Sequence, residues 1–209
     1  MKFYDRHILP HVINCACATK PIRRQREKII PLAHGDVVEI GIGSGHNLPY
    51  YDQDKVTKLI GIDPDEYVWK KAAPNRAKFF KPLERLGLSG ENIPLPDACA
   101  DTVVVTYSLC TIPDPVKALV EMKRLLKPSK LGQARAKILF CEHGLAPDAN
   151  VHKWQNRIDP IWKRISGGCH SGRDIPALLK SAGLDIDVME EMYVPGPKIL
   201  SYNYWGQAS

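Results

Sequence analysis

Three glycines at alternate positions, Gly41, Gly43 and Gly45, follow an apolar run in the segment VVEIGIGSGHN, residues 37–47. Such a loop is typical of the turn between a buried strand and a helix that binds a nucleotide-like ligand. The dinucleotide fingerprint GxGxxG has its third glycine where this chain has His46. Because an imidazole there would crowd a pyrophosphate at the helix start, the loop favours a ligand without phosphates.

A carboxylate stands at the spacing that a ribose requires. Asp63 ends the next predicted strand, about 20 residues beyond the first glycine, where it can accept hydrogen bonds from both sugar hydroxyls. With Glu39 before the glycines, these features resemble motif I of class I S-adenosylmethionine (SAM)-dependent methyltransferases, and Gly90-Glu91 resembles the family's pair near the adenine. The expected cofactor is therefore SAM. The residues expected to bind it are Glu39, Gly41, Gly43, Gly45, Asn47, Asp63, Pro64, Gly90, Glu91, Thr106 and Ser108.

A narrower resemblance covers roughly residues 24–206. The stretches GIGSGHNLPYY, VTYSLCTI, FCEHG, WQNRIDPIWKRISGGCH and YNYWGQA resemble the methyltransferase-like-seven group, whose animal members methylate thiols. The resemblance implies transfer of a methyl group to a small, apolar thiol. Animal members carry an N-terminal hydrophobic membrane anchor, whereas this chain has MKFYDRHILPHVINCACA there.

Three other functions stay open at this point. Phospholipid (phosphatidylethanolamine) and quinone methyltransferases share the earlier motifs and are the alternative acceptor classes. A non-enzymatic SAM-binding regulator would keep the glycine loop and Asp63 but would not need an acceptor cleft. Turnover of SAM to S-adenosylhomocysteine distinguishes this regulator from an enzyme.

Two histidines are candidates for a catalytic base. Methyl transfer from a sulfonium chiefly requires alignment of the nucleophile, and a thiol with a pKa of about 8.5 needs only modest help in losing its proton. His143 follows the fifth predicted strand in CEHG, and His170 lies in GGCHSG. Both stand where acceptor-facing loops belong, although a structural histidine bonded to a loop carbonyl is an equally good interpretation.

The six cysteines predict neither a disulfide framework nor a metal site. Cys15 and Cys17 form CxC, the other four are scattered, and no CxxC occurs. Free thiols indicate a reducing compartment, and a cytoplasmic protein is expected. An arsenite methyltransferase would bring several cysteines together, for which Cys15, Cys17, Cys110 and Cys169 show no spacing signature.

The formal net charge is +6, which suits an anionic partner. The densest basic stretch, residues 20–28, is interpreted as a solvated helix face, and without interleaved aromatic residues a nucleic acid is not an expected partner. The N-terminal helix, with Phe3, Ile8, Val12 and Ile13, is expected to pack on the domain, to cover the pocket as a lid or to touch a membrane surface. The oligomeric state is not predicted.

Alternation of strands and helices predicts the fold. Strands are expected at 36–41, 58–63, 77–82, 101–109 and 136–144, with helices at 113–128 and 173–184. A two-piece helix is expected around 151–165, restarting at Asp159-Pro160, and residues 185–194 and 198–206 are expected to form a hairpin. The pattern predicts a single-domain α/β, Rossmann-like, doubly wound and mostly parallel seven-stranded sheet with an antiparallel C-terminal hairpin. Residues 1–34 are expected to form a helical arm or lid on the domain formed by residues 35–209.

Overall fold

In the computed structural model, which describes residues 2–129 and 134–209, seven strands form one sheet in the order β3-β2-β1-β4-β5-β7-β6. Strands β1 to β5 run parallel, and β7 lies antiparallel between β5 and β6. The predicted doubly wound sheet with an antiparallel C-terminal hairpin is confirmed. The strands are β1 Gly35–Ile40, β2 Val56–Ile62, β3 Leu83–Leu86, β4 Thr102–Thr106, β5 Lys137–His143, β6 Ile186–Tyr193 and β7 Tyr202–Ala208.

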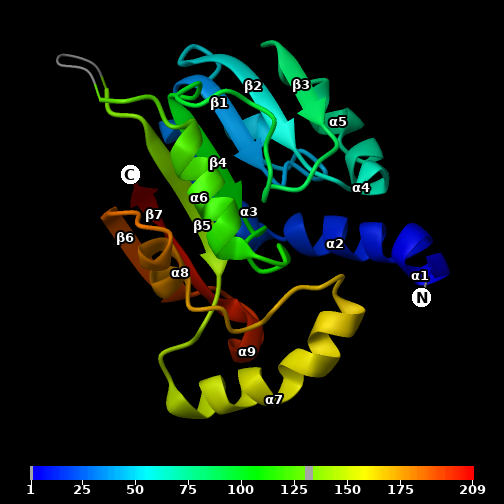
Figure 1. Cartoon of the computed structure of the whole chain (residues 1–209). Coiled ribbons are helices and arrows are strands. Elements are labelled where there is room, and N and C mark those ends of the chain that lie inside the picture. The colour runs from blue at the N-terminus through cyan, green and yellow to red at the C-terminus, as the bar shows by residue number, and fades with distance from the viewer. Residues whose placement is uncertain (1, 130–133) are drawn as a thin grey trace.

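Helices cover both faces of the sheet (Figure 1). The α-helices of the described residues are α1 Lys2–His7, α2 Leu9–Cys17, α3 Lys20–Ile29, α4 Glu66–Lys70, α5 Ala73–Arg76, α6 Pro115–Leu125, α7 Ala149–Ile165, α8 Ile175–Ser181 and α9 Lys198–Ser201. Successive side chains of a strand point to opposite faces of the sheet. The central strands carry apolar side chains at consecutive positions, so both of their faces are apolar. On β1, Val38 packs into the core on the α6 and α8 side, while Val37 joins Ile29 and Ile30 at the end of α3.

The order of the strands reverses at β1. This strand pairs with β2 on one side and with β4 on the other, so the loops after β1 and β4 diverge and leave a crevice at the carboxyl ends of the strands. Helices α1, α2 and α7 lie beyond this edge of the sheet (Figure 1). Among the described residues, none of the helices combines the length and the apolar character that crossing a bilayer requires.

The third strand lies later than predicted. Residues 77–82 form a turn after α5, and β3 begins at Leu83, opposite Leu59. The apolar pair that indicated a strand has another role: Phe79 is buried and meets Tyr51 edge to face, whereas Phe80 is 84% exposed. A single buried aromatic side chain anchors this turn, and the residues around it do not alternate between buried and exposed as they would in a strand.

Two further boundaries were wrong. Helix α7 continues through Pro160 instead of restarting there, so Asp159 is not an N-cap. Proline removes the N–H that would bond the carbonyl of residue 156, and this loss is tolerated because Asn156 is exposed to water. Residues 198–201 form the short helix α9, and the last strand begins only at Tyr202.

Candidate functional site

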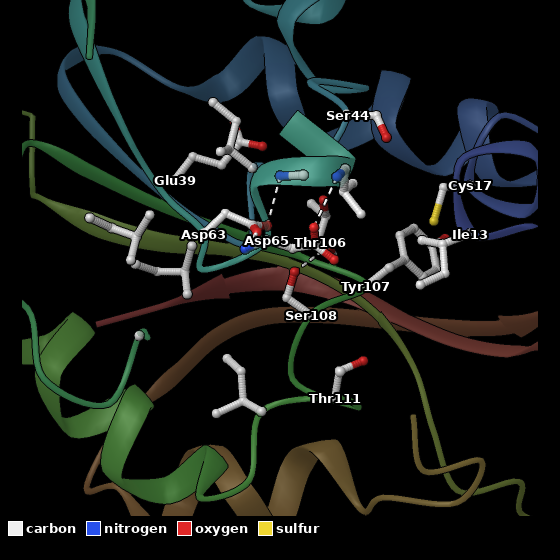
Figure 2. Close-up of a pocket in the computed structure, with 18 of the residues that line it drawn as sticks. Ile13, Cys17, Glu39, Ser44, Asp63, Asp65, Thr106, Tyr107, Ser108 and Thr111 are labelled. Atoms are coloured by element: carbon white, nitrogen blue, oxygen red, sulfur yellow. Dashed lines mark hydrogen bonds between the residues drawn. The ribbon is translucent and has the colours of Figure 1, made fainter. Parts of the chain in front are cut away.

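A cavity of about 390 Å³ occupies the crevice at the reversal of strand order. Its walls come from the loops after β1, β2 and β4, from Ser89 and Gly90 before β4, and from the N-terminal helices α2 and α3. Figure 2 shows Asp63 and Asp65 toward one side of this cavity and Ile13 and Cys17 of α2 toward the other. Nine of the eleven predicted cofactor residues therefore line one cavity together with the N-terminal segment, and Gly45 and Glu91 are the two that do not.

The glycine loop has a backbone that side chains would not allow. Gly41 has a φ of +74°, its N–H donates to the Ile62 carbonyl at 2.7 Å, and a Cβ there would come 1.9 Å from the Ser108 Oγ. Gly43 and Gly45 also have positive φ values of +47° and +67°. The loop thus lies directly against the start of the loop after β4, and both belong to the cavity wall.

Asp63 connects the glycine loop to the end of β2. Its Oδ2 accepts from the Gly43 N–H at 2.9 Å, and its Oδ1 accepts from the Asp65 N–H at 2.8 Å. Burial raises the pKa of the Asp63 carboxyl group, and these two bonds oppose the increase. A carboxylate oxygen can accept two hydrogen bonds, and each Asp63 oxygen accepts one in this structure. Asp63 can therefore accept further hydrogen bonds from a ligand in the cavity, which it lines with Pro64.

Both carboxylate oxygens of Glu39 accept hydrogen bonds beneath the glycine loop. Its Oε1 accepts from the Asn47 Nδ2 at 2.9 Å and its Oε2 accepts from the Tyr51 hydroxyl at 2.7 Å. The same Asn47 nitrogen donates to the Thr106 Oγ1 at 2.9 Å. Burial raises the pKa of Glu39 to about 7, against the hydrogen bonds from Tyr51 and Asn47. These predicted cofactor residues form a buried polar network between β1 and β4.

Gly90 and Glu91, predicted as a pair near the adenine, lie differently. Gly90 lines the cavity, and a Cβ there would meet the Ile40 Cγ2 at 2.8 Å. The Glu91 side chain instead accepts from the Asp114 N–H and the Ser89 hydroxyl, both at 2.7 Å. Glu91 therefore braces its own loop and is not part of the cavity wall.

His46, which replaces the third glycine of the dinucleotide fingerprint, connects the loop to the N-terminal helices. Its Nε2 lies 3.2 Å from the Asn14 carbonyl, a contact that requires this nitrogen to carry the proton. Burial and the nearby Arg26 lower the pKa of His46 to about 4. A neutral imidazole therefore holds α2 against the cavity.

Arg26 is a cavity residue that the sequence did not reveal. The basic stretch 20–28 was interpreted as a solvated helix face, but α3 buries Gln25 and Arg26, and Arg26 is only 3% exposed. Its Nη1 donates to the Cys17 carbonyl at 2.7 Å, and its guanidinium carbon lies 5.0 Å from the centre of the Tyr107 ring. Its Nε has no hydrogen-bond partner, and no carboxylate of the described residues forms an ion pair with it. An unpaired cation on the wall suits an anionic ligand group.

Neither of the predicted catalytic histidines lines the cavity. The Nε2 of His143 lies 3.3 Å from the Cys169 Sγ in the interior, and the Nδ1 of His170 lies 2.8 Å from the Asp159 Oδ2. Burial lowers the pKa of His143, but the hydrogen bond and charge of Cys169 together with the charge of Glu142 leave the pKa raised. A catalytic role for either residue stays a prediction, and their immediate contacts are structural.

Comparison with known proteins defines the class. A family model described as a methyltransferase domain matches residues 38–131. A SAM-dependent methyltransferase from Leishmania major superposes with a TM-score of 0.70 at 14% identity, over 99% of this chain and 80% of the other. Residues 38–131 thus match a methyltransferase domain, and the whole chain has the fold of class I SAM-dependent methyltransferases.

The chain is also similar to proteins named thiol S-methyltransferase. It is 34% identical to thiol S-methyltransferase TMT1B of Rattus norvegicus over 66% of this chain and 55% of the relative. The Homo sapiens TMT1B is 29% identical over 78% of this chain and 68% of that protein. In the first of these relatives, the chain thus spans little more than half the length.

Proposed function

We propose that this protein transfers a methyl group from SAM to the thiol of a small, apolar acceptor. The observation that carries the proposal is a single cavity at which the glycine loop and Asp63 meet the apolar side chains of Leu9 and Ile13 from α2. One wall provides hydrogen-bonding groups for a polar nucleoside, and the other provides a surface for an apolar acceptor. The similarity to proteins named thiol S-methyltransferase supports the choice of acceptor.

The cofactor is expected to use three kinds of group. Asp63 accepts from the ribose hydroxyls, and the positive-φ glycines let the backbone approach the ligand closely. The buried Arg26 pairs with the carboxylate of the methionine portion, the anionic group that SAM offers. Glu39 and Asn47 hold the loop in place from below, and Thr106 and Ser108 complete the wall at the end of β4.

The acceptor is expected to enter beside α2 and the loop after β4, where Thr111 and Ile112 also line the cavity. Transfer is a displacement in which the bond from the SAM sulfur to the methyl carbon breaks as the bond from acceptor sulfur to carbon forms. Alignment of the two sulfurs can supply about 7–11 kcal/mol of the barrier. A thiol ionises partly near neutral pH, so modest assistance suffices, and His143 and His170 remain candidates for this assistance.

Matched acceptors test the proposal. Purified protein with SAM is given an aryl or alkyl thiol, the corresponding alcohol, the corresponding amine, a quinol and phosphatidylethanolamine vesicles. We expect S-adenosylhomocysteine and the methyl thioether with the thiol, and neither product with the alcohol. Turnover confined to phosphatidylethanolamine or a quinol would show that this compound, and not a thiol, is the acceptor. SAM binding without turnover of any acceptor would show that the protein is a SAM-binding regulator and not an enzyme.

We further propose that residues 1–34 act as a lid and touch membrane surfaces in a cytoplasmic protein. Phe3, Ile8 and Val12 are exposed, whereas Leu9 and Ile13 of the same segment line the cavity. An apolar outer face on a segment that also lines the cavity suits delivery of an apolar acceptor from a membrane. Sedimentation with neutral and anionic vesicles tests this, with a Phe3→Ser/Val12→Ser variant as the comparison; equal sedimentation of both proteins would contradict it.

A further inference from the structure

Three potential metal ligands converge beside the cavity. Cys110 follows β4, His143 ends β5 and Cys169 lies in the loop after α7, so the sequence separates them widely. Their two Sγ atoms and one imidazole nitrogen all lie within 4.8 Å of one another, and the Cys169 Sγ is 3.3 Å from the His143 Nε2. The sequence, which has no CxxC motif and no spacing signature among its cysteines, predicted no metal site.

The donor set has a definite chemical preference. Two thiolates and one imidazole are the ligands of zinc, at about 2.3 Å for Zn–S and about 2.0–2.1 Å for Zn–N. Tetrahedral bonds of these lengths place the donor atoms roughly 3.5–3.8 Å apart, so even the widest of the three separations has to close by only about 1 Å. Mg²⁺ and Ca²⁺ prefer carboxylate and water oxygens as ligands, whereas this cluster consists of two cysteines and one histidine.

The loops that carry the ligands are held in place without a metal. The His170 N–H donates to the Cys110 carbonyl at 2.9 Å, joining the loop after β4 to the loop after α7. Asp159 accepts from the Ser171 N–H at 2.7 Å and from the Ser171 hydroxyl at 3.0 Å, and these bonds fix the chain just beyond Cys169. His143 is fixed by its place at the end of a central strand. Loops held in this way reduce the cost of assembling a metal site.

We propose that Cys110, His143 and Cys169 bind a Zn²⁺ ion and leave a fourth coordination position for water or another small ligand. Three protein ligands with a fourth, exchangeable one is the pattern of reactive zinc sites, whereas closed structural sites use four protein ligands. The neighbouring residues Thr111 and Gly167 line the cavity. A bound ion would therefore fix two loops of the acceptor wall, independently of how SAM binds.

Cobalt provides a direct measurement, because Co²⁺ occupies zinc sites and thiolate ligands give it a near-ultraviolet charge-transfer band. Protein purified under reducing conditions and freed of metal is titrated with Co²⁺ and then with Zn²⁺, in the absence of SAM and acceptor. We expect one equivalent of Co²⁺ with thiolate absorption, displaced by one equivalent of Zn²⁺. Cys110→Ser, Cys169→Ser and His143→Gln should each weaken binding by more than the ~10–100-fold that loss of an outer-shell partner costs.

Two matched variants, Cys15→Ser and Cys99→Ser, change cysteines outside the cluster and should keep the wild-type affinity for Co²⁺. Circular dichroism and SAM titration identify any variant that fails to fold. No stoichiometric binding by folded wild-type protein, equal binding by all the variants, or a Cys110–Cys169 disulfide that persists in reductant would overturn the proposal. Since neither SAM nor an acceptor is present, failure here leaves the proposed methyl transfer untouched. Success would make His143 a metal ligand and leave His170 as the candidate base.

Discussion

The two walls of the cavity are built in different ways. The cofactor wall consists of short loops at the ends of β1, β2 and β4, whose backbone is fixed by positive φ values and by the buried bonds of Glu39 and Asp63. The acceptor wall comes from α2 and from residues 111–112 and 167, which are three segments far apart in the sequence. Substitutions on the cofactor wall should therefore change SAM affinity, and substitutions on the acceptor wall should change acceptor preference.

The largest effect is expected for Gly41→Ala. The residue has a φ of +74°, and its new Cβ would lie 1.9 Å from the Ser108 Oγ. Positive φ and overpacking each cost about 1–3 kcal/mol, so SAM affinity should fall by roughly 100-fold or more in calorimetric titration. Gly87→Ala is the matched control, since a Cβ there meets nothing closer than the flexible Arg85 side chain at 3.6 Å. Equal affinities for the two variants would show that the cofactor wall is not rigid.

Glu39→Gln should alter the pH dependence of stability. The pKa of Glu39 is raised from 4.5 to about 7 in the folded protein, so folding favours the protonated form. The associated stability is fully present below about pH 4.5 and is lost as pH rises through 7, a change of roughly 3 kcal/mol. Between pH 5 and pH 8, the free energy of unfolding measured by chemical denaturation should therefore fall by roughly 3 kcal/mol less in Glu39→Gln than in the wild type.

Glu142 provides a comparison near the acceptor wall. Burial raises its pKa to about 7 as well, and its Oε1 accepts from the Ser108 and Leu109 N–H groups. The contribution of Glu142 to the pH dependence of stability should persist in Glu39→Gln, so the variant should still lose some stability as the pH rises. Glu66→Gln is the exposed control and should keep the wild-type slope on the alkaline side. Superimposable pH profiles for wild type and Glu39→Gln would contradict the burial of an ionisable group beneath the loop.

Asp63→Ala should weaken SAM binding by about 2 kcal/mol, or about 30-fold, through loss of charge-assisted hydrogen bonds. The substitution also leaves the Gly43 and Asp65 N–H groups without their acceptors. Calorimetry measures the effect, with Glu66→Gln at the start of the adjacent helix as the control. An unchanged dissociation constant would remove Asp63 from the cofactor wall, whereas a changed acceptor KM alone would move it to the other wall.

The same division explains what could be predicted from sequence. Gly41, Asp63 and the strands that precede them were recognised because local backbone requirements leave a pattern in adjacent residues. The place of Arg26 on the cavity wall and the convergence of Cys110, His143 and Cys169 were not predicted, because both depend on tertiary packing. Residues 77–82 were mistaken for a strand for a related reason, since burial of Phe79 under a turn depends on its distant partner Tyr51.

The smallest effect is expected for Ile13→Ala, and it tests the acceptor wall. Ile13 lines the cavity from α2, and removing its outer carbons should cost an apolar thiol about 1–2 kcal/mol of contact, or roughly 5–30-fold in KM. Val12→Ala on the same helix changes a side chain that is 50% exposed and should leave KM within about twofold of wild type. The loss should grow with the length of the thiol, because longer chains reach more of α2. SAM affinity should stay unchanged in both variants; if it fell in Ile13→Ala, α2 would contact the cofactor as well, and the two walls would not be separable.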